Sequence, residues 1–119
     1  MHLTGMQTTV FRKPLLNIPL GLKTITSVDV REIRFGPRQQ TGRHKHPCPV
    51  IGYVVEGTAL LEVEGQSAVT LPPGSSFYEP ADTIISRFDN AGDTPMTFIA
   101  HYLLHGEQAL IEMLPEKQR

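Results

Sequence analysis

Hydrophobic and polar residues alternate along this chain in short runs that are separated by turn residues. A strand places successive side chains on opposite faces of a sheet, so alternation over about four to eight residues predicts a half-buried strand. Ten glycines and ten prolines mark many of the breaks between runs. The predicted strands are 28–35, 50–56, 58–64, 67–71, 76–79, 83–89 and 94–104. Strands this short and this closely spaced predict an all-β sandwich or barrel.

Two neighbouring runs differ in the burial that they predict. Residues 50–56 are almost wholly apolar, which favours a strand buried on both faces. Residues 58–64 alternate, with Leu61 and Val63 on one face of the strand and polar residues mainly on the other. Gly57 is expected to form the corner between these two strands.

The two ends of the chain are patterned less clearly than its middle. Segments near 8–12 and 22–27 are rich in β-prone residues, and Pro14 and Pro19 lie between them. We expect edge strands there, because proline is tolerated at a sheet edge and not in a central ladder. Residues 107–114 show helical spacing of apolar positions, and we expect a short segment that caps the barrel or packs on a partner subunit.

Composition restricts the classes of function. The chain has 119 residues, enough for one domain with a core of its own, and its formal net charge is −1. Without a basic surface it is not expected to bind nucleic acid. Its single cysteine, Cys48, excludes an internal disulfide. The sequence has no apolar run long enough to span a bilayer and no secretory leader, so we expect a cytoplasmic protein that is not associated with membranes.

One short motif carries candidate chemistry. His44 and His46 flank Lys45, and in an extended strand the two imidazoles project from the same face. Neutral imidazole nitrogen binds zinc, copper, iron or nickel, so the pair predicts part of a metal site. The alternative is that the histidines only line a pocket and bind a carboxylate or hydroxyl of a ligand. The nearby Cys48 is either a reactive or metal-binding thiol or simply a small buried residue.

The region from residue 36 to residue 90 resembles a cupin, the germin-like double-stranded β-helix in which a jelly roll closes into a small barrel. The family carries two motifs, roughly G-x5-H-x-H-x(3,4)-E-x6-G and G-x5-P-x-G-x2-H-x3-N. The first is matched by His44, His46 and Gly57, and the second by Gly74 and Pro80 at the expected interval. The resemblance covers about half of the chain. It implies an all-β cupin fold and a single-domain small cupin.

The sequence departs from the cupin pattern at several motif positions, including two usual metal ligands. Val50 stands at the position of the family's glutamate and Ile85 at that of its second-motif histidine. The leading glycine, the second glycine and the asparagine of the motifs are replaced by Arg38, Asp82 and Asp89. Two neutral histidines facing aliphatic side chains would hold a divalent ion weakly and would leave its charge uncompensated.

Three other residues could restore the coordination of a metal. Tyr78 and Glu79 precede the turn that leads to Ile85, and His101 lies in the last long strand. We predict a metal site made of His44, His46 and Glu79, with a divalent transition metal (Zn, Fe, Ni, Mn or Cu) as cofactor. The alternative roles are structural: a turn glutamate, a packing tyrosine and a hydrogen-bonded sheet histidine.

Two classes of function follow from the resemblance and its departures. The ligand count slightly favours a non-enzymatic small-molecule binding or sensor role, with a degenerate two-histidine metal site. The alternative is a metal-dependent cupin enzyme of the dioxygenase or isomerase type, with a non-standard third ligand beside the histidines. The predicted ligand-binding residues are His44, His46, Val50, Gly52, Tyr78, Ile85 and His101.

The whole chain, 1–119, is expected to be one cupin domain. We assign N-terminal strands to 1–27, the β-barrel to 28–104 and a C-terminal tail to 105–119. The resemblance implies a homodimer, in which the N-terminal strands pack on or exchange with a second subunit. Four apolar residues among prolines fit a surface that is covered elsewhere, namely Leu15, Leu16, Ile18 and Leu20.

Overall fold

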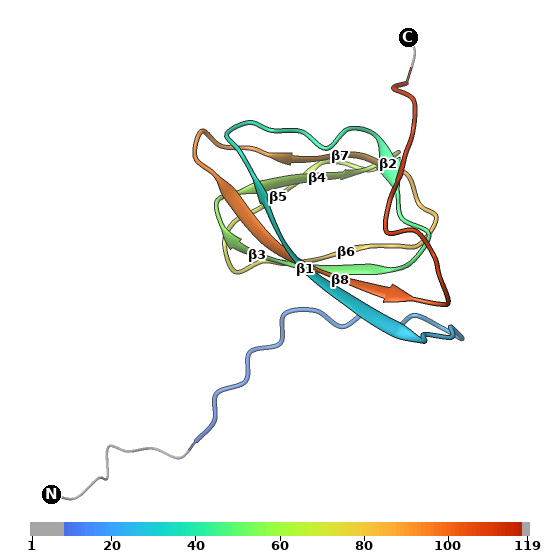
Figure 1. Ribbon diagram of the computed structural model, residues 1–119. Coiled ribbons are helices and arrows are strands. Elements are labelled where there is room, and N and C mark those ends of the chain that lie inside the picture. Colours follow the sequence, from blue (N-terminus) through green and yellow to red (C-terminus); the bar gives the residue numbers. More distant parts are fainter. Residues whose placement is uncertain (1–8, 118–119) are drawn as a thin grey trace, which may run out of the picture.

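The structure is a computed structural model, and it describes residues 9–117. Two antiparallel sheets face each other and enclose the core (Figure 1). The first sheet consists, in spatial order, of β1 (Ser27–Phe35), β8 (Met96–Leu104), β3 (Val50–Glu56) and β6 (Ser76–Glu79). The second consists of β5 (Val69–Leu71), β4 (Ala59–Val63), β7 (Ile85–Asn90), β2 (His44–Lys45) and β9 (Glu112–Met113).

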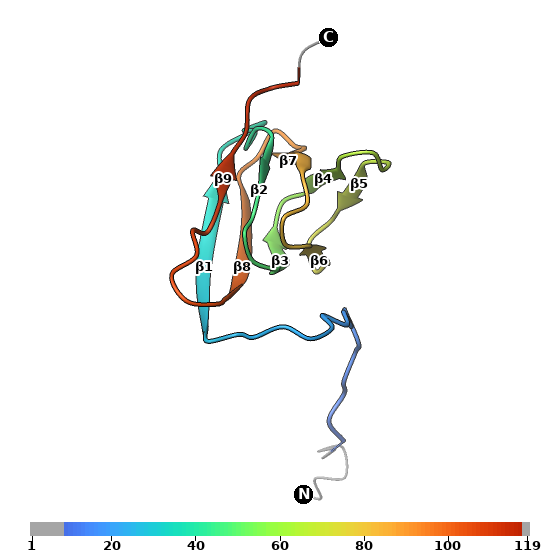
Figure 2. The ribbon, with the colours of Figure 1, turned by 90° about the vertical axis from the view of Figure 1, so that its right-hand side faces the viewer.

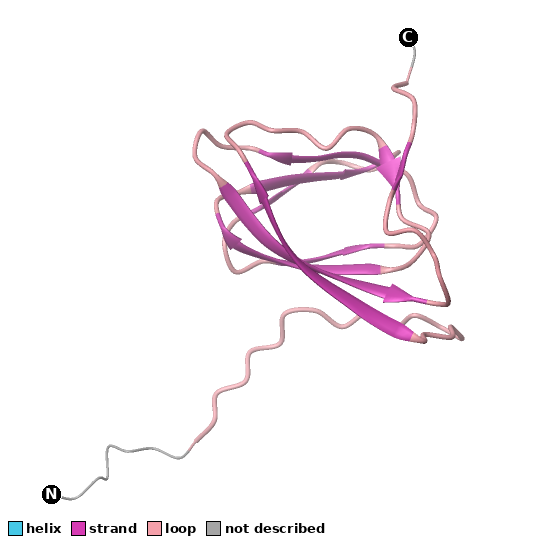
Figure 3. Ribbon diagram, in the orientation of Figure 1, coloured by secondary structure: helices cyan, strands magenta, loops and turns pink. Residues whose placement is uncertain are grey.

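The order of the strands confirms the predicted jelly-roll barrel. The chain passes to the opposite sheet at nearly every connection, and only β4 and β5 are consecutive strands of one sheet. The part of the chain that the structure describes contains no helix (Figure 3). All seven strands expected from the alternation are formed, with ends within two residues of those predicted. The predicted all-β class is therefore confirmed.

Gly57 makes the corner between β3 and β4, as expected. Its φ is 79°, in the region that side chains disfavour, and a Cβ atom there would lie 2.9 Å from the Met96 Cα and the Pro95 oxygen. The position therefore requires glycine both for its backbone angle and for its close approach to the start of β8.

The prediction that 50–56 is buried on both faces is wrong. Burial alternates along β3: Val50, Gly52 and Val54 are buried, whereas Tyr53 and Val55 are exposed by 37% and 49%. The outer face of β3 carries exposed apolar side chains in the single chain, so an almost wholly apolar sequence here does not mean burial on both faces.

Within the described residues the expected N-terminal strands are absent, and the helical spacing of 107–114 does not correspond to a helix. Residues 9–26, which two prolines interrupt, form no strand, although β1 leaves one edge of the first sheet free (Figure 2); residue 8 lies outside the described range. Residues 107–114 form no helix. The segment is irregular except for β9, which pairs with β2 through His44 opposite Met113, so tertiary pairing overrides the helical spacing.

Four phenylalanines from both sheets form the centre of the barrel. Phe88 of β7 packs against Phe98 and Phe77 of the opposite sheet with ring centroids 4.9 Å and 5.0 Å apart, and Phe35 of β1 meets Phe98 edge to face at 5.5 Å. Aromatic pairs in such geometries add to the stability that area burial provides. This cluster joins the two sheets and forms the apolar floor of the cavity described below.

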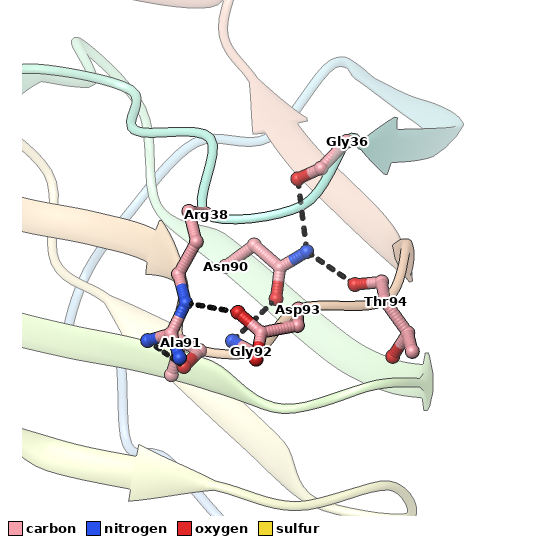
Figure 4. A network of polar contacts seen from close by, with 7 residues as sticks. All are labelled: Gly36, Arg38, Asn90, Ala91, Gly92, Asp93 and Thr94. Carbon is pink, nitrogen blue, oxygen red and sulfur yellow. Dashed lines mark hydrogen bonds and ion pairs between the residues drawn. The ribbon is translucent and has the colours of Figure 1, made fainter.

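One end of the barrel is closed by a polar network around Asn90 (Figure 4). The buried Asn90 amide nitrogen donates to the carbonyl oxygens of Gly36 at 2.9 Å and Thr94 at 2.7 Å, and its oxygen accepts from the Gly92 amide. Arg38 donates to Asp93 at 2.7 Å. The network ties the end of β1 to the β7–β8 turn.

Within residues 9–117, no helix exists that is long and apolar enough to cross a membrane. The cytoplasmic location stays a prediction.

Candidate metal centre

The two histidines lie inside the barrel, at the end where β2 is located. His44 belongs to β2 and His46 follows it directly, and both rings are at least 94% buried. Their ring centroids are 5.0 Å apart with the planes nearly perpendicular. The extended backbone between them gives both side chains the same direction, which is the parity that the His-x-His pattern predicts.

A carboxylate reaches the same point from the opposite sheet. Glu79 is the last residue of β6, where Phe77 and Glu79 share the inner face, and it is 3% exposed. In the register of the sheet Glu79 pairs with Val50, the residue at the family's glutamate position. The carboxylate is therefore present, displaced by one strand within the same sheet.

The three side chains converge on one spot. The Nε2 atom of His46 is 2.6 Å from Glu79 Oε1, and that of His44 is 3.6 Å from the same oxygen. One donor atom from each of the three residues lies within 4.8 Å of the others. Two imidazoles and one carboxylate at this spacing form a ligand set for a divalent transition metal.

Hydrogen bonds on the far side of each ring fix which nitrogen faces the cluster. The Nδ1 atoms of His44 and His46 lie 2.7 Å from the carbonyl oxygens of Gly42 and Leu110, so each Nδ1 carries a proton and donates it. In a neutral ring Nε2 is then an acceptor. Two acceptor nitrogens facing a carboxylate oxygen repel it unless a cation lies among them, either a proton or a metal ion. The donor set thus fits a metal.

The pKa values of the cluster shift in the directions that such a shared cation requires. Burial lowers the pKa of His44, but the Glu79 carboxylate and the Gly42 carbonyl outweigh burial and raise it above its ordinary 6.5. Burial raises the pKa of Glu79, and the hydrogen bonds and charges of the two histidines reverse this and lower it below 4.5. The carboxylate is accordingly ionised at neutral pH, ready to offset a metal's charge.

The cluster opens into a cavity of about 330 Å³ between the sheets. Its walls are mainly apolar and include the four phenylalanines, Ile33, Val50 and Leu110. Apart from His44, His46 and Glu79, polar side chains reach the cavity from Arg31, Thr41 and Tyr102. The volume lies at the small end of the roughly 300–1,000 Å³ typical of ligand sites.

The structure divides the other predicted ligand-binding residues into three groups. Val50 lines the cavity next to Glu79. Gly52 and Ile85 are buried but do not line it, since the Phe77 ring covers Gly52, and Ile85 pairs with His44 in the core. Tyr78 and His101 alternate with inward residues, and the Nδ1 of His101 lies 3.0 Å from the Ile51 carbonyl oxygen. Neither side chain joins the metal cluster.

Cys48 is fully buried and does not line the cavity. Burial raises the pKa of its thiol, which therefore stays protonated at neutral pH.

Sequence reasoning missed Arg31, Tyr102 and the contribution of the tail. Arg31 shares the inner face of β1 with Ile33 and Phe35, and strict alternation back from those apolar residues would have placed it there. Tyr102 packs edge to face on His46 at 5.8 Å. No local signal marks Leu110, whose carbonyl orients His46 through a contact 64 residues away in sequence.

A family model for the cupin domain matches residues 31–102. The chain therefore belongs to the cupin domain family, as its two motifs indicate. Among curated proteins, none matches the sequence significantly.

Solved structures show the same fold. A cupin-like protein from Thermotoga maritima superposes with a TM-score of 0.66 at 22% identity, over 75% of this chain and 65% of that one. A DMSP lyase from Ruegeria pomeroyi gives 0.64 at 20% identity, over 73% and 43%. An oxalate oxidase, solved with the substrate analogue glycolate, gives 0.64 at 20%, over 73% and 46%. The chain spans less than half the length of the lyase and the oxidase.

Proposed function

We propose that this cupin holds one divalent transition metal ion through His44, His46 and Glu79, and that the ion and the cavity beside it bind a small organic molecule. The observation that carries this proposal is the convergence of three buried ligand atoms whose outer hydrogen bonds leave both Nε2 atoms directed at the carboxylate. Zinc, iron, nickel, manganese and copper all accept this mixture of imidazole and carboxylate.

The protein's own residues prepare the site for such an ion. The carbonyl oxygens of Gly42 and Leu110 orient the imidazoles, and hydrogen bonds of this outer kind support metal affinity. The Glu79 charge offsets one of the two positive charges. The apolar walls exclude water, which strengthens electrostatic interactions inside the cavity. A bound ion would act there as a Lewis acid on an oxygen atom of the small molecule.

Catalysis is the second candidate function, and one specific observation favours it. The preference for a non-enzymatic role depended on two missing ligands, and Glu79 restores the count to two histidines and one carboxylate. Three protein ligands are the usual number at catalytic metal sites, because they leave positions for substrate. The lyase and the oxidase with this fold are enzymes by name, which agrees with this candidate.

Metal analysis tests the proposal directly. Protein purified without a chelator or an affinity tag, then supplied with each of the five metals, is expected to retain about one ion per chain after desalting. His44→Ala is expected to retain almost none, because it removes one of three ligands. His105→Ala is the matched control, since that exposed histidine lies outside the cluster. Equal metal in the wild-type protein and His44→Ala would refute the site.

We further propose that the chain forms a homodimer through the outer face of the first sheet. Val28 and Val30 of β1 are exposed by 54% and 56%, and Tyr53 and Val55 of β3 are exposed on the same face, with β8 between the two strands. The N-terminal part of the segment 9–26 runs away from the barrel and exposes apolar side chains of its own, including Leu15 at 48% (Figure 1). A two-fold dimer would let the arm of one subunit cover the sheet of the other.

Light scattering at micromolar concentration is expected to give twice the mass of the chain. Val30→Lys should yield a monomer, because it places a charge in the apolar face, whereas Val69→Lys on the outer strand β5 should leave the dimer intact. A monomeric wild-type protein, or equal effects of the two variants, would rule out this interface.

A further inference from the structure

We propose that the ligand of the cavity is a small monocarboxylate with an apolar body, whose carboxylate binds at the end of the cavity formed by Arg31 and Tyr102. This inference rests on the proposed ligand-binding role of the cavity and names the chemical class of the ligand. It follows from the position of one cation at the edge of an otherwise apolar wall.

Arg31 is placed at the cavity by the register of the first sheet. It lies on the inner face of β1, opposite Ala100 of β8, and lines the cavity together with that alanine. Because the Ala100 side chain is small, the space beside the arginine is not filled from the neighbouring strand. The guanidinium therefore stands at the border between solvent, where its side chain is 55% exposed, and the apolar interior.

The ion pair with Asp29 orients the guanidinium and leaves some of its donors available. Asp29 accepts from Nε at 2.9 Å and from Nη2 at 3.2 Å, so it engages one edge of the planar group. The Nη1 donors take no part in this pair. Arginine offers a second, end-on pair of donors that matches a carboxylate, and a guanidinium already fixed by Asp29 loses less freedom when it binds one.

Tyr102 supplies a second donor between the arginine and the metal centre. It faces Asp29 in the β1–β8 register and packs on His46, and the charges of both Glu79 and Arg31 act on its hydroxyl. Its phenolic hydroxyl is a hydrogen-bond donor, and Tyr102 lines the same cavity as Arg31. A carboxylate at this end would thus find a cation and a neutral donor.

The rest of the cavity fits an apolar body and disfavours a polyhydroxylated one. The four phenylalanines, Ile33 and Leu110 offer no hydrogen-bonding side chain. The Thr41 hydroxyl already donates to the Phe88 carbonyl at 2.6 Å. A sugar would leave several hydroxyls without partners here, and each such loss is costly. An aromatic ring or a short branched chain suits both the lining and the volume of about 330 Å³.

The test compares benzoate with its neutral isostere benzamide, and hexanoate as a non-aromatic carboxylate, by titration calorimetry and ligand-observed NMR. The wild-type protein is expected to bind benzoate or hexanoate at least about tenfold more tightly than benzamide, and added salt should reduce this preference. Arg31→Gln should abolish the preference. Arg31→Lys should keep part of it, because lysine retains the positive charge but lacks the pair of donors that matches a carboxylate.

Asp29→Asn separates ligand binding from a structural role of the ion pair. Arg31→Gln and Asp29→Asn break the same pair, so a structural effect would weaken benzoate binding in both. If the guanidinium binds the carboxylate, Asp29→Asn should instead strengthen binding by a few fold, because it removes a competing anion. Changes in the same direction, equal affinity for benzoate and benzamide, or no binding of any probe would overturn the inference.

Titrations of metal-loaded and chelator-treated protein distinguish this inference from the proposed metal site. A carboxylate preference that depends on Arg31 in both forms supports the inference even if metal analysis fails. A preference that is lost with the metal and unchanged in Arg31→Gln would overturn it, and would assign the carboxylate to the ion instead.

Discussion

Glu79→Gln is expected to lower the affinity of the protein for a divalent metal by at least about a hundredfold. Loss of an outer hydrogen-bond partner of a ligand already costs roughly ten- to a hundredfold, and Glu79 is itself a ligand in the proposed site. Glutamine keeps the size of the side chain and removes the charge that offsets the ion. Competition with a chromophoric chelator at neutral pH measures the change, and Glu32→Gln on the exposed side of β1 is the control. An unchanged affinity would exclude Glu79 from the site.

The same variant should reveal the cluster in the metal-free protein through the pH dependence of stability. The raised pKa of His44 means that its contribution is complete below 6.5 and is lost as the pH rises through the raised value. The lowered pKa of Glu79 means that its contribution is complete above 4.5 and is lost as the pH falls through the lowered value. Both contributions are complete between pH 4.5 and pH 6.5. The difference in thermal midpoint between the wild-type protein and Glu79→Gln should therefore be largest in this range. Metal affinity should instead rise with pH, because the ion competes with protons for the imidazoles.

Local alternation predicted the strands well because most strands of the barrel bury only one of their two faces. Glycines and prolines ended the runs at the correct places, and Gly57 was identifiable as a corner from sequence alone. The alternation could not reveal β9, which forms only because the tail reaches β2. It also predicted the wrong burial for 50–56, because apolar residues on an exposed face give the same sequence pattern as apolar residues on a buried one.

The candidate site depended on strand parity, which a sequence fixes less firmly than strand location. Tyr78 and His101 were named beside Glu79, and each is the direct neighbour of a residue that does line the cavity, Glu79 and Tyr102. A shift of one residue sends a side chain to the opposite face of a sheet. Glu79 was named as the third ligand from sequence, but its position opposite residue 50, where the family has its glutamate, depends on the register between β3 and β6 and is not visible in a local pattern.

The same register explains why residue 52 is glycine. Gly52 lies directly opposite Phe77, and the phenylalanine ring folds across the β3 backbone, so that a Cβ atom at Gly52 would lie only 2.0 Å from its Cζ. Phe77 in turn packs on Phe88 and Phe98. Glycine is needed at this position for space, and it lets one aromatic ring form the floor of the cavity.

Gly52→Ala is consequently expected to destabilise the protein by about 3 kcal/mol, the upper part of the usual range for an overpacked core, and to push the Phe77 ring into the cavity. Phe77→Leu alone should cost about 1–2 kcal/mol, because it leaves a partly filled gap. The double variant should be more stable than the sum of the two losses allows, since leucine leaves room for the added methyl group. Chemical denaturation of all four proteins gives the coupling energy. Gly36→Ala, where φ is not positive and a Cβ atom would meet no atom closer than 3.7 Å, separates the packing effect from the loss of a glycine. Strictly additive losses would mean that the ring does not determine the residue at position 52.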